Sequence, residues 1–219
     1  MKSKAAVRRI VEALKKLYPD AMCSLQYQKD YELLFAVRLS AQCTDARVNM
    51  VTPALYARFP TLEAFANASY EEVGEAIKSC GFYNTKSKDL VECAKILLEK
   101  YGGRVPGTME ELTSLPGIGR KTANLTVAVG FDLPAICVDV HVHRICNWLQ
   151  LVHTKKPVET EMKLREILPV RYWKTWNSHL VSFGQTRCDP AHPKCAGCPI
   201  AAYCHSPKKK SDSTGRQSP

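Results

Sequence analysis

The chain has 219 residues, 45% of them hydrophobic, and its 31 Lys and Arg outnumber 21 Asp and Glu, which gives a formal charge of +10. This length suffices for one large domain or two small ones, and the lack of any apolar run of about 18 residues excludes a membrane-spanning helix. The N-terminal segment MKSKAAVRRI carries charges and no apolar core, so it is not a secretory signal. The positive charge favours a polyanionic partner, most often nucleic acid.

The first predicted element is an amphipathic helix over residues 4–18. Its apolar residues recur at helical spacing, and the opposite face is basic. The apolar stripe consists of Val7, Ile10, Val11, Leu14 and Leu17. A helix of this kind packs its stripe against a core and leaves its cations in solvent.

Helix signals continue along the chain. Residues 69–72 and 108–111 match the capping-box pattern that begins a helix, and Gly81 and the glycine pair at 102–103 are stop signals. The segment 134–145 alternates as a strand would, yet residues 139–152 also fit a helix capped by Asp139. We favour the helix because the neighbouring segments are helical, and we therefore expect an all-α fold.

Residues 115–124, LPGIGRKTAN, predict a helical hairpin with a Gly-x-Gly turn. Such a turn leaves backbone N–H groups pointing outward, and together with the helix N-terminus they form an anion site that can hold a DNA phosphate without reading sequence. The glycines allow a close approach because they lack Cβ atoms. A simple connector between two helices is the alternative reading of this turn.

Lys121 and Asp139 are the candidate catalytic residues. The dipole at a helix N-terminus destabilises the ammonium form of Lys121 and so favours a neutral amine, which is a competent nucleophile. A phosphate contact is the alternative role of Lys121, and an N-cap is the alternative role of Asp139. His141 and His143 are two residues apart, so on a helix they diverge and make a poor metal pair.

The ten cysteines fall into two groups. Six have no ligand-like spacing, and we assign them to packing: Cys23, Cys43, Cys80, Cys93, Cys137 and Cys146. The other four have the spacing C-x6-C-x2-C-x5-C: Cys188, Cys195, Cys198 and Cys204. Four thiolates so close in sequence predict a metal site, and the spacing leaves zinc and an iron–sulfur cluster both open.

These motifs together resemble the endonuclease III family of helix-hairpin-helix DNA glycosylases and AP lyases. The resemblance rests on LPGIGRKTAN, on VDVHVHR at 138–144, on the cysteine spacing, on LSAQCTD at 39–45 and on CGFYNTKSKDL at 80–90, and it runs from about residue 5 to 205. It implies a six-helix domain at 23–133 that contains the hairpin. It also implies a discontinuous [4Fe-4S] cluster domain made of 1–22 and 134–205. Damaged double-stranded DNA would bind between the two domains. The polar, low-complexity composition of residues 206–219 separately predicts a disordered basic tail.

The resemblance also implies roles for individual residues. Lys121 matches the nucleophile that forms a Schiff base with the sugar, and Asp139 matches the carboxylate that stabilises positive charge on it. Gln42 matches a residue that fills the space of the flipped base, and Phe82 stands where the family often has an aliphatic wedge. The remaining expected DNA contacts are Leu115, Gly117, Ile118, Gly119, Arg120, His141, Arg187 and Lys194.

The implied activity is excision of oxidised pyrimidines followed by strand cleavage through β-elimination. A pyrimidine-dimer or mismatch-adenine glycosylase of the same superfamily is the alternative, and a non-catalytic module that binds DNA structure is another. We expect a monomeric bacterial protein in the cytoplasm, associated with the nucleoid.

Overall fold

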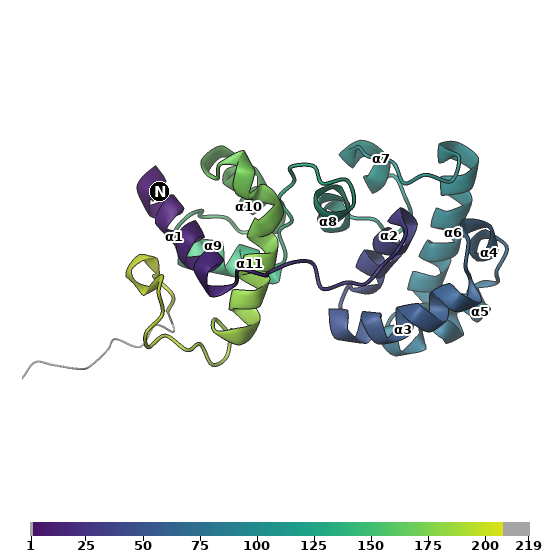
Figure 1. The fold of residues 1–219 in the computed structure, drawn as a ribbon, viewed down its shortest axis with the longest axis horizontal. Helices are drawn as coiled ribbons and strands as arrows, with labels where there is room; N and C mark the ends of the chain where they lie inside the picture. Colours follow the sequence, from purple (N-terminus) through teal and green to yellow (C-terminus); the bar gives the residue numbers. More distant parts are fainter. Residues whose placement is uncertain (1, 208–219) are drawn as a thin grey trace, which may run out of the picture. The chain divides into compact units, whose positions relative to one another are not determined.

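The computed structural model describes residues 2–207, and every regular element in that range is a helix, so the expected all-α fold is confirmed. The chain divides into two compact units (Figure 1). The central unit is Cys23–Ala135, and the split unit combines Met1–Met22 with the chain from Ile136 onward. The domain boundary expected at residue 133 falls slightly before this division.

The central unit is built around one buried helix. Its elements are α2 (Asp30–Leu39), α3 (Asp45–Arg58), α4 (Leu62–Ala66), α5 (Tyr70–Ala76), a 3₁₀ turn (Lys78–Cys80), α6 (Tyr83–Tyr101), α7 (Met109–Thr113) and α8 (Arg120–Gly130). Helix α2 is apolar around most of its circumference, with Leu33, Leu34 and Phe35 almost fully buried, which is typical of a helix enclosed by others. Both α6 and α8 pack against it.

The predicted start and stop signals of the central unit are confirmed. Ser69 caps α5 in a reciprocal capping box with Glu72, and the Thr108 side chain accepts a hydrogen bond from the Glu111 amide at the start of α7. Gly102 ends α6 in the left-handed conformation, with φ of 58°. Local sequence chemistry therefore accounts for where these helices begin and end.

The split unit joins the N-terminal helix to the C-terminal part of the chain. Its elements are α1 (Lys4–Leu17), α9 (Val140–Trp148), α10 (Pro157–Ile167), a 3₁₀ turn (Val170–Tyr172), α11 (Trp173–Thr186) and a second 3₁₀ turn (Ala201–Tyr203). Four members of the predicted α1 stripe are buried, but Leu17 is exposed because the helix ends there. Asp139 caps α9, as the helical interpretation of this segment requires.

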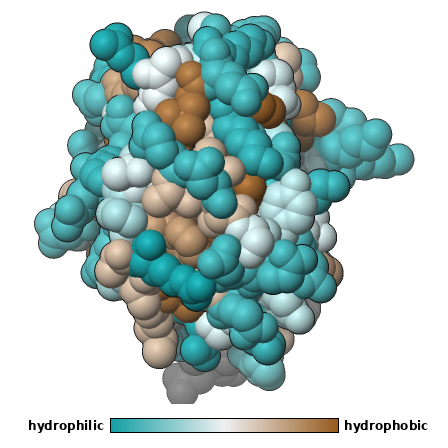
Figure 2. Space-filling model, turned by 90° about the vertical axis from the view of Figure 1, so that its right-hand side faces the viewer, coloured by the Kyte–Doolittle hydropathy of each residue, from teal (hydrophilic) through white to brown (hydrophobic). Residues whose placement is uncertain are grey.

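The end of the described chain corrects one expectation. The polar tail was expected to begin at residue 206, but Ser206 is buried and its amide donates a hydrogen bond to Cys204 Sγ at 3.4 Å. The rest of the expected tail, from residue 208, lies outside the described residues. Within residues 2–207 no helix is long and apolar enough to cross a membrane. Figure 2 shows one face of the molecule, where apolar side chains are interspersed with hydrophilic ones.

Candidate active site

The predicted hairpin is present, and its apolar residues anchor it. Helices α7 and α8 pack together, and the Ile118 amide donates to the Leu115 carbonyl at 3.1 Å within the turn. The side chains of Leu115 and Ile118 are only 3% and 5% exposed. Both point into the core, so either residue can contact DNA only through its backbone.

Gly117 rests directly on an ion pair. Its φ is +69°, and a Cβ there would lie 2.3 Å from both Arg38 Nε and Asp89 Oδ2. Arg38 donates from Nε and Nη2 to Asp89 Oδ2, at 2.8 and 2.6 Å. The sequence offers no signal for this pair, because its members are 51 positions apart. The pair nevertheless packs against the turn at Gly117 and leaves no space there for a Cβ atom.

The N-terminus of α8 is available to an anion. Its N-cap is Gly119, which has no side chain to accept hydrogen bonds from the first-turn amides. Within residues 2–207 the amides of Gly117 and Gly119 donate to no other group. Arg120 and Lys121 are exposed in the first turn. Outward amides, the helix dipole and two cations together suit a phosphate.

Lys121 lies near the Cys23 thiol, a neighbour that the sequence did not suggest. Burial raises the pKa of the Cys23 thiol; the Asp45 carboxylate adds to this rise, and the Lys121 ammonium opposes it. Ser24 Oγ donates to Asp45 Oδ2 at 2.6 Å, which fixes that carboxylate at the start of α3. Lys121 and Asp45 therefore both lie near the Cys23 thiol, within the central unit.

Gln42 and Phe82 share an unusual backbone. Both are exposed, and both have positive φ, 54° and 49° respectively. Residues other than glycine seldom adopt this region, and strained conformations of this kind concentrate at functional sites. An exposed fraction of 66% for the Phe82 side chain is also high for a large apolar residue.

A buried lysine connects the segments that precede Gln42 and Phe82. Lys86 is 1% exposed, and its Nζ donates to the Leu39 carbonyl at 2.8 Å and to the Cys80 carbonyl at 2.9 Å. Burial lowers the pKa of Lys86. Sequence reasoning missed this residue, since a lysine in a polar helical stretch is normally solvated.

In the split unit, Asp139 and the histidines behave as local chemistry predicts. Asp139 Oδ1 accepts a hydrogen bond from the Val142 amide at 2.8 Å, so its capping role is confirmed. His141 packs against α11, where a Cβ on Gly184 would lie 2.3 Å from its Nδ1. His143 instead contacts Thr160 at 2.7 Å, so the two rings diverge.

The four clustered cysteines line one apolar cavity, together with Ile145, Trp148, Leu149, Phe183 and Ile200. Burial raises the pKa of Cys188 to about 11; the nearby Arg144 guanidinium opposes this rise, and the other three thiols add to it. Within the described residues no group of three such side chains has the spacing of metal ligands.

Two half-buried arginines make this cavity suitable for an anionic centre. Arg187 lines the cavity, and Arg144 donates to the Cys188 carbonyl at 2.7 Å. The Nε groups of both are buried and have no hydrogen-bond partner within residues 2–207. Buried donors without partners are costly, so an acceptor is expected beside them. A thiolate-bound cluster with negative charge fits this donor set.

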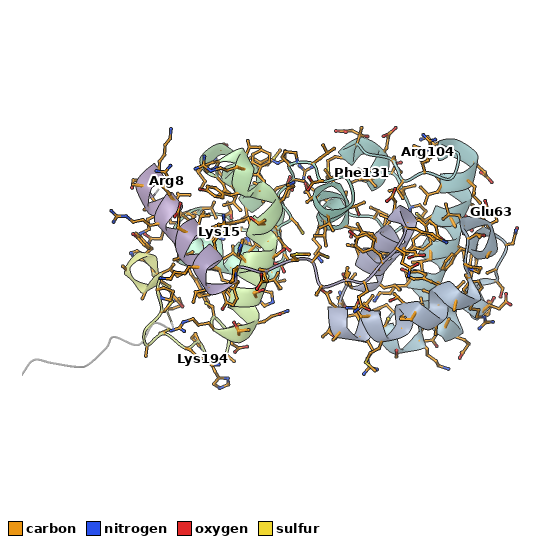
Figure 3. The ribbon with its side chains drawn as sticks, viewed as in Figure 1. Arg8, Lys15, Glu63, Arg104, Phe131 and Lys194 are labelled. Atoms are coloured by element: carbon orange, nitrogen blue, oxygen red, sulfur yellow. The ribbon has the colours of Figure 1, made fainter. Side chains whose placement is uncertain are left out.

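Arg187 and Lys194 are both tied to the cysteine loop. Arg187 Nη2 donates to the Ala196 carbonyl at 2.7 Å, and Lys194 Nζ donates to the Thr186 carbonyl at 3.2 Å. Lys194 is exposed, whereas Arg187 is half-buried. Lys194 is labelled in Figure 3 with Arg8 and Lys15 of α1, and all three carry exposed cations of the split unit. Lys194 is thus better placed than Arg187 to contact a phosphate.

Comparison with known proteins identifies the family. The family model described as "HhH-GPD superfamily base excision DNA repair protein" matches residues 35–170. The chain belongs to the HhH-GPD superfamily. It is 41% identical over 204 residues to endonuclease III of Synechocystis sp. (strain ATCC 27184 / PCC 6803 / Kazusa), which covers 93% of each chain. It is 40% identical over 195 residues to endonuclease III of Bacillus subtilis (strain 168), covering 89% of each.

Solved structures agree with this assignment to the HhH-GPD superfamily. A trapped endonuclease III–DNA covalent intermediate matches with a TM-score of 0.89 and 38% identity, covering 93% of this chain and 96% of that one. A non-covalent endonuclease III–DNA complex matches equally well. The chain is a base excision repair enzyme, a DNA glycosylase and AP lyase, and the resemblance noted in its sequence is confirmed.

Proposed function

We propose that the enzyme excises oxidised pyrimidines and that the Lys121 amine is its nucleophile. The damaged nucleotide leaves the base stack, because its sugar carbon is unreachable inside the duplex. Lys121 Nζ attacks C1′, and the bond to the base breaks with its electron pair leaving on the base, which takes up a proton. The amine then forms a Schiff base with the opened sugar. Loss of a C2′ proton expels the 3′ phosphate, which cleaves the strand by β-elimination.

The position of Lys121 carries this proposal. It is an exposed amine in the first turn of α8, directly after the Gly-x-Gly turn. A phosphate held by the hairpin amides would bring a sugar near this amine. The related structure described as a trapped covalent intermediate supports a covalent mechanism for this chain as well.

Asp139 is proposed as the carboxylate of the same reaction. Its Oδ1 is engaged by the Val142 amide, and this hydrogen bond fixes the side chain at the N-terminus of α9. A carboxylate held in place before the reaction stabilises positive charge on the sugar at no reorganisation cost. Capping and catalysis are therefore compatible in one residue.

The remaining DNA contacts belong to the same proposal. Gln42 and Phe82 are proposed to occupy the space of the flipped nucleotide, which their exposure and left-handed backbones support. Lys194 and the hairpin amides are proposed to hold phosphates. One chain would act on one DNA site as a monomer.

We also propose that the four clustered cysteines hold a [4Fe-4S] cluster. The support is the set of four thiols lining one apolar cavity beside two arginines whose Nε atoms are buried. Such a cluster would supply a rigid, four-point attachment for the loop that carries Lys194. Cys188, Cys195, Cys198 and Cys204 would be its ligands.

Borohydride trapping tests the nucleophile. The holoprotein is incubated with duplex DNA that contains thymine glycol, and borohydride is added to reduce the Schiff base. We expect a covalent adduct that disappears in Lys121→Ala and persists in Lys100→Ala, a matched control because Lys100 is also exposed and lies in the central unit. An undiminished adduct in Lys121→Ala would show that another amine reacts.

One substrate panel separates this activity from the alternatives. Thymine glycol, dihydrouracil, a cyclobutane dimer and adenine opposite 8-oxoguanine are offered under identical conditions. Excision of the first two supports the proposal. Selective processing of the dimer would favour the pyrimidine-dimer branch, which would use the same lysine and aspartate.

A further inference from the structure

One buried amine joins the two exposed segments that carry Gln42 and Phe82. Lys86 Nζ donates to the Leu39 carbonyl at 2.8 Å and to the Cys80 carbonyl at 2.9 Å. Because one nitrogen contacts both oxygens, the end of α2 and the end of the 3₁₀ turn lie next to each other in the central unit. Gln42 follows shortly after the first carbonyl, and Phe82 follows shortly after the second. The contacts of this single side chain therefore lie at the base of both segments.

Lys86 holds the backbone on both sides of Phe82. Its amide donates to the Phe82 carbonyl at 3.0 Å at the start of α6, and its side chain returns to the Cys80 carbonyl before Phe82. Between these two hydrogen bonds, Gly81 and Phe82 both have positive φ, 69° and 49°. A residue other than glycine keeps such a backbone only where its surroundings impose it. Lys86 supplies two of the contacts that impose it on Phe82.

The turn that carries Gln42 begins at the end of α2 that Lys86 contacts. Leu39 is the last residue of α2, and the last carbonyls of a helix have no partner inside the helix. Lys86 donates to the Leu39 carbonyl, and the helix dipole also favours a cation at this end. The Cys43 amide donates to the Ser40 carbonyl at 3.1 Å and closes the turn, within which Gln42 has φ of 54°. Anchoring Leu39 therefore fixes the start of this turn.

The stability of the core alone does not require a lysine at this position. Lys86 is 1% exposed, and within residues 2–207 it forms no ion pair. Burial penalises the charged form and lowers the pKa of Lys86. An apolar side chain of similar length would fill the same space without desolvating an amine. Such a side chain could not supply the hydrogen bonds to the two carbonyls.

We propose that Lys86 is a positioning residue for base excision, which fixes the Gln42 and Phe82 segments in a conformation that receives the flipped nucleotide. This inference rests on the proposed roles of Gln42 and Phe82. Segments that are fixed before DNA binds do not have to be ordered when the base leaves the stack, so less binding energy is lost. Because Lys86 is buried, it acts through these two residues and does not contact DNA itself.

Hydrogen exchange tests the anchoring without a measurement of activity. Lys86→Met removes both side-chain hydrogen bonds and keeps the length of the side chain. The matched control is Lys100→Met, because Lys100 is exposed and lies near the other end of α6. In the full-length holoprotein we expect residues 40–43 and 80–86 to exchange several-fold faster in Lys86→Met only, with the rest of the central unit unchanged. Faster exchange throughout the central unit, or no change in these two segments, would overturn the proposal.

A fluorescent base tests whether the two segments still enter the duplex. The DNA carries 2-aminopurine opposite a tetrahydrofuran abasic analogue, so the signal depends on unstacking and needs no excision. At saturating protein we expect equal signals from wild type and Lys100→Met and a smaller one from Lys86→Met. Equal signals from wild type and Lys86→Met would refute the positioning role, whichever lesion the enzyme excises.

Two substrates separate positioning from a general loss of active protein. In Lys86→Met, single-turnover excision of thymine glycol from duplex DNA should fall about tenfold or more. Strand cleavage at an abasic site in single-stranded DNA should fall less than about twofold, because no base has to leave a stack. Equal losses on both substrates would contradict the proposal. If the wild type excises no thymine glycol, the proposed lesion class fails, while the exchange and fluorescence results still decide the role of Lys86.

Two further variants keep the test decisive if Lys86→Met does not fold. Lys86→Arg retains donors for both carbonyls and should restore most of the fluorescence signal and of the excision rate. Lys86→Gln is shorter and should lose the contact to at least one carbonyl, with faster exchange in the segment that it releases. A folded Lys86→Gln with wild-type exchange, fluorescence and excision would overturn the proposal.

Discussion

Gly117→Ala should be far more damaging than the same change at Gly119, two residues along the same turn. At Gly117 the new Cβ would lie 2.3 Å from Arg38 Nε and Asp89 Oδ2, and the backbone has φ of +69°. At Gly119, φ is −88° and nothing lies within 4 Å of the added atom. The two substitutions are chemically identical, so their difference isolates the close approach and the backbone conformation.

The magnitude follows from these two terms. A left-handed backbone costs an L-residue about 1–2 kcal/mol. Relieving the clash must break at least one charge-assisted hydrogen bond of the Arg38–Asp89 pair, whose side chains are 14% and 15% exposed, at about 1.5–3 kcal/mol. The sum is about 2.5–5 kcal/mol, or roughly 5–20 °C in Tm for a chain of this size. Gly119→Ala should cost at most about 1 kcal/mol, because alanine is a poorer N-cap than glycine.

Thermal unfolding followed by circular dichroism measures the difference, and a salt titration of DNA binding measures the loss of the hairpin. The double variant Arg38→Ala/Asp89→Ala supplies a further check, because in that background Gly117→Ala should cost only the backbone term. Equal Tm values for Gly117→Ala and Gly119→Ala would refute the reasoning, since they would mean that the turn yields without disturbing the ion pair.

Three further predictions concern the split unit. The Asp139→Asn variant should be as stable as the wild type, because asparagine also caps helices. Its rate of base excision should fall on the order of 10²-fold in single-turnover assays. An unchanged excision rate would show that Asp139 acts only as a helix cap. His179 is buried, and burial lowers its pKa, so as the pH falls His179 is protonated in the unfolded chain before it is protonated in the folded protein. The free energy of unfolding should therefore decline below about pH 6.5. Urea titrations at pH 7 and pH 5 measure this decline, and His179→Gln should remove the contribution of His179 to it. Cys198→Ser should lower the iron content from about four per chain, and stoichiometric zinc in the wild type would contradict the proposed cluster.

The helices and their ends were predictable because their causes are local. Ser69 and Thr108 cap through side chains that reach amides three residues on, and Gly102 ends α6 by adopting positive φ. Asp139 was recognisable for the same reason, as a cap immediately before an apolar helical pattern. Leu17 was misassigned to the buried stripe because periodicity does not show where a helix leaves the core.

The hairpin and the cysteine motif were also predictable from the sequence, because each consists of residues that are close together in the chain. The ordered combination of these motifs was enough to indicate the family. Spacing could not distinguish zinc from iron, since both accept four thiolates. That distinction came from the resemblance, because the half-buried arginines beside the cavity suit any negatively charged thiolate-bound centre.

The sequence by itself determined the helical elements, their caps, the hairpin and the four-cysteine motif, all of which depend on contacts between near neighbours in the chain. Only the tertiary structure decided that Gly117 rests on the Arg38–Asp89 pair and that Lys86 is buried between two carbonyls. These arrangements join residues far apart in sequence, and no local propensity encodes them. They exist because the core of the central unit closes around α2 and brings distant polar groups into contact where water can no longer solvate them.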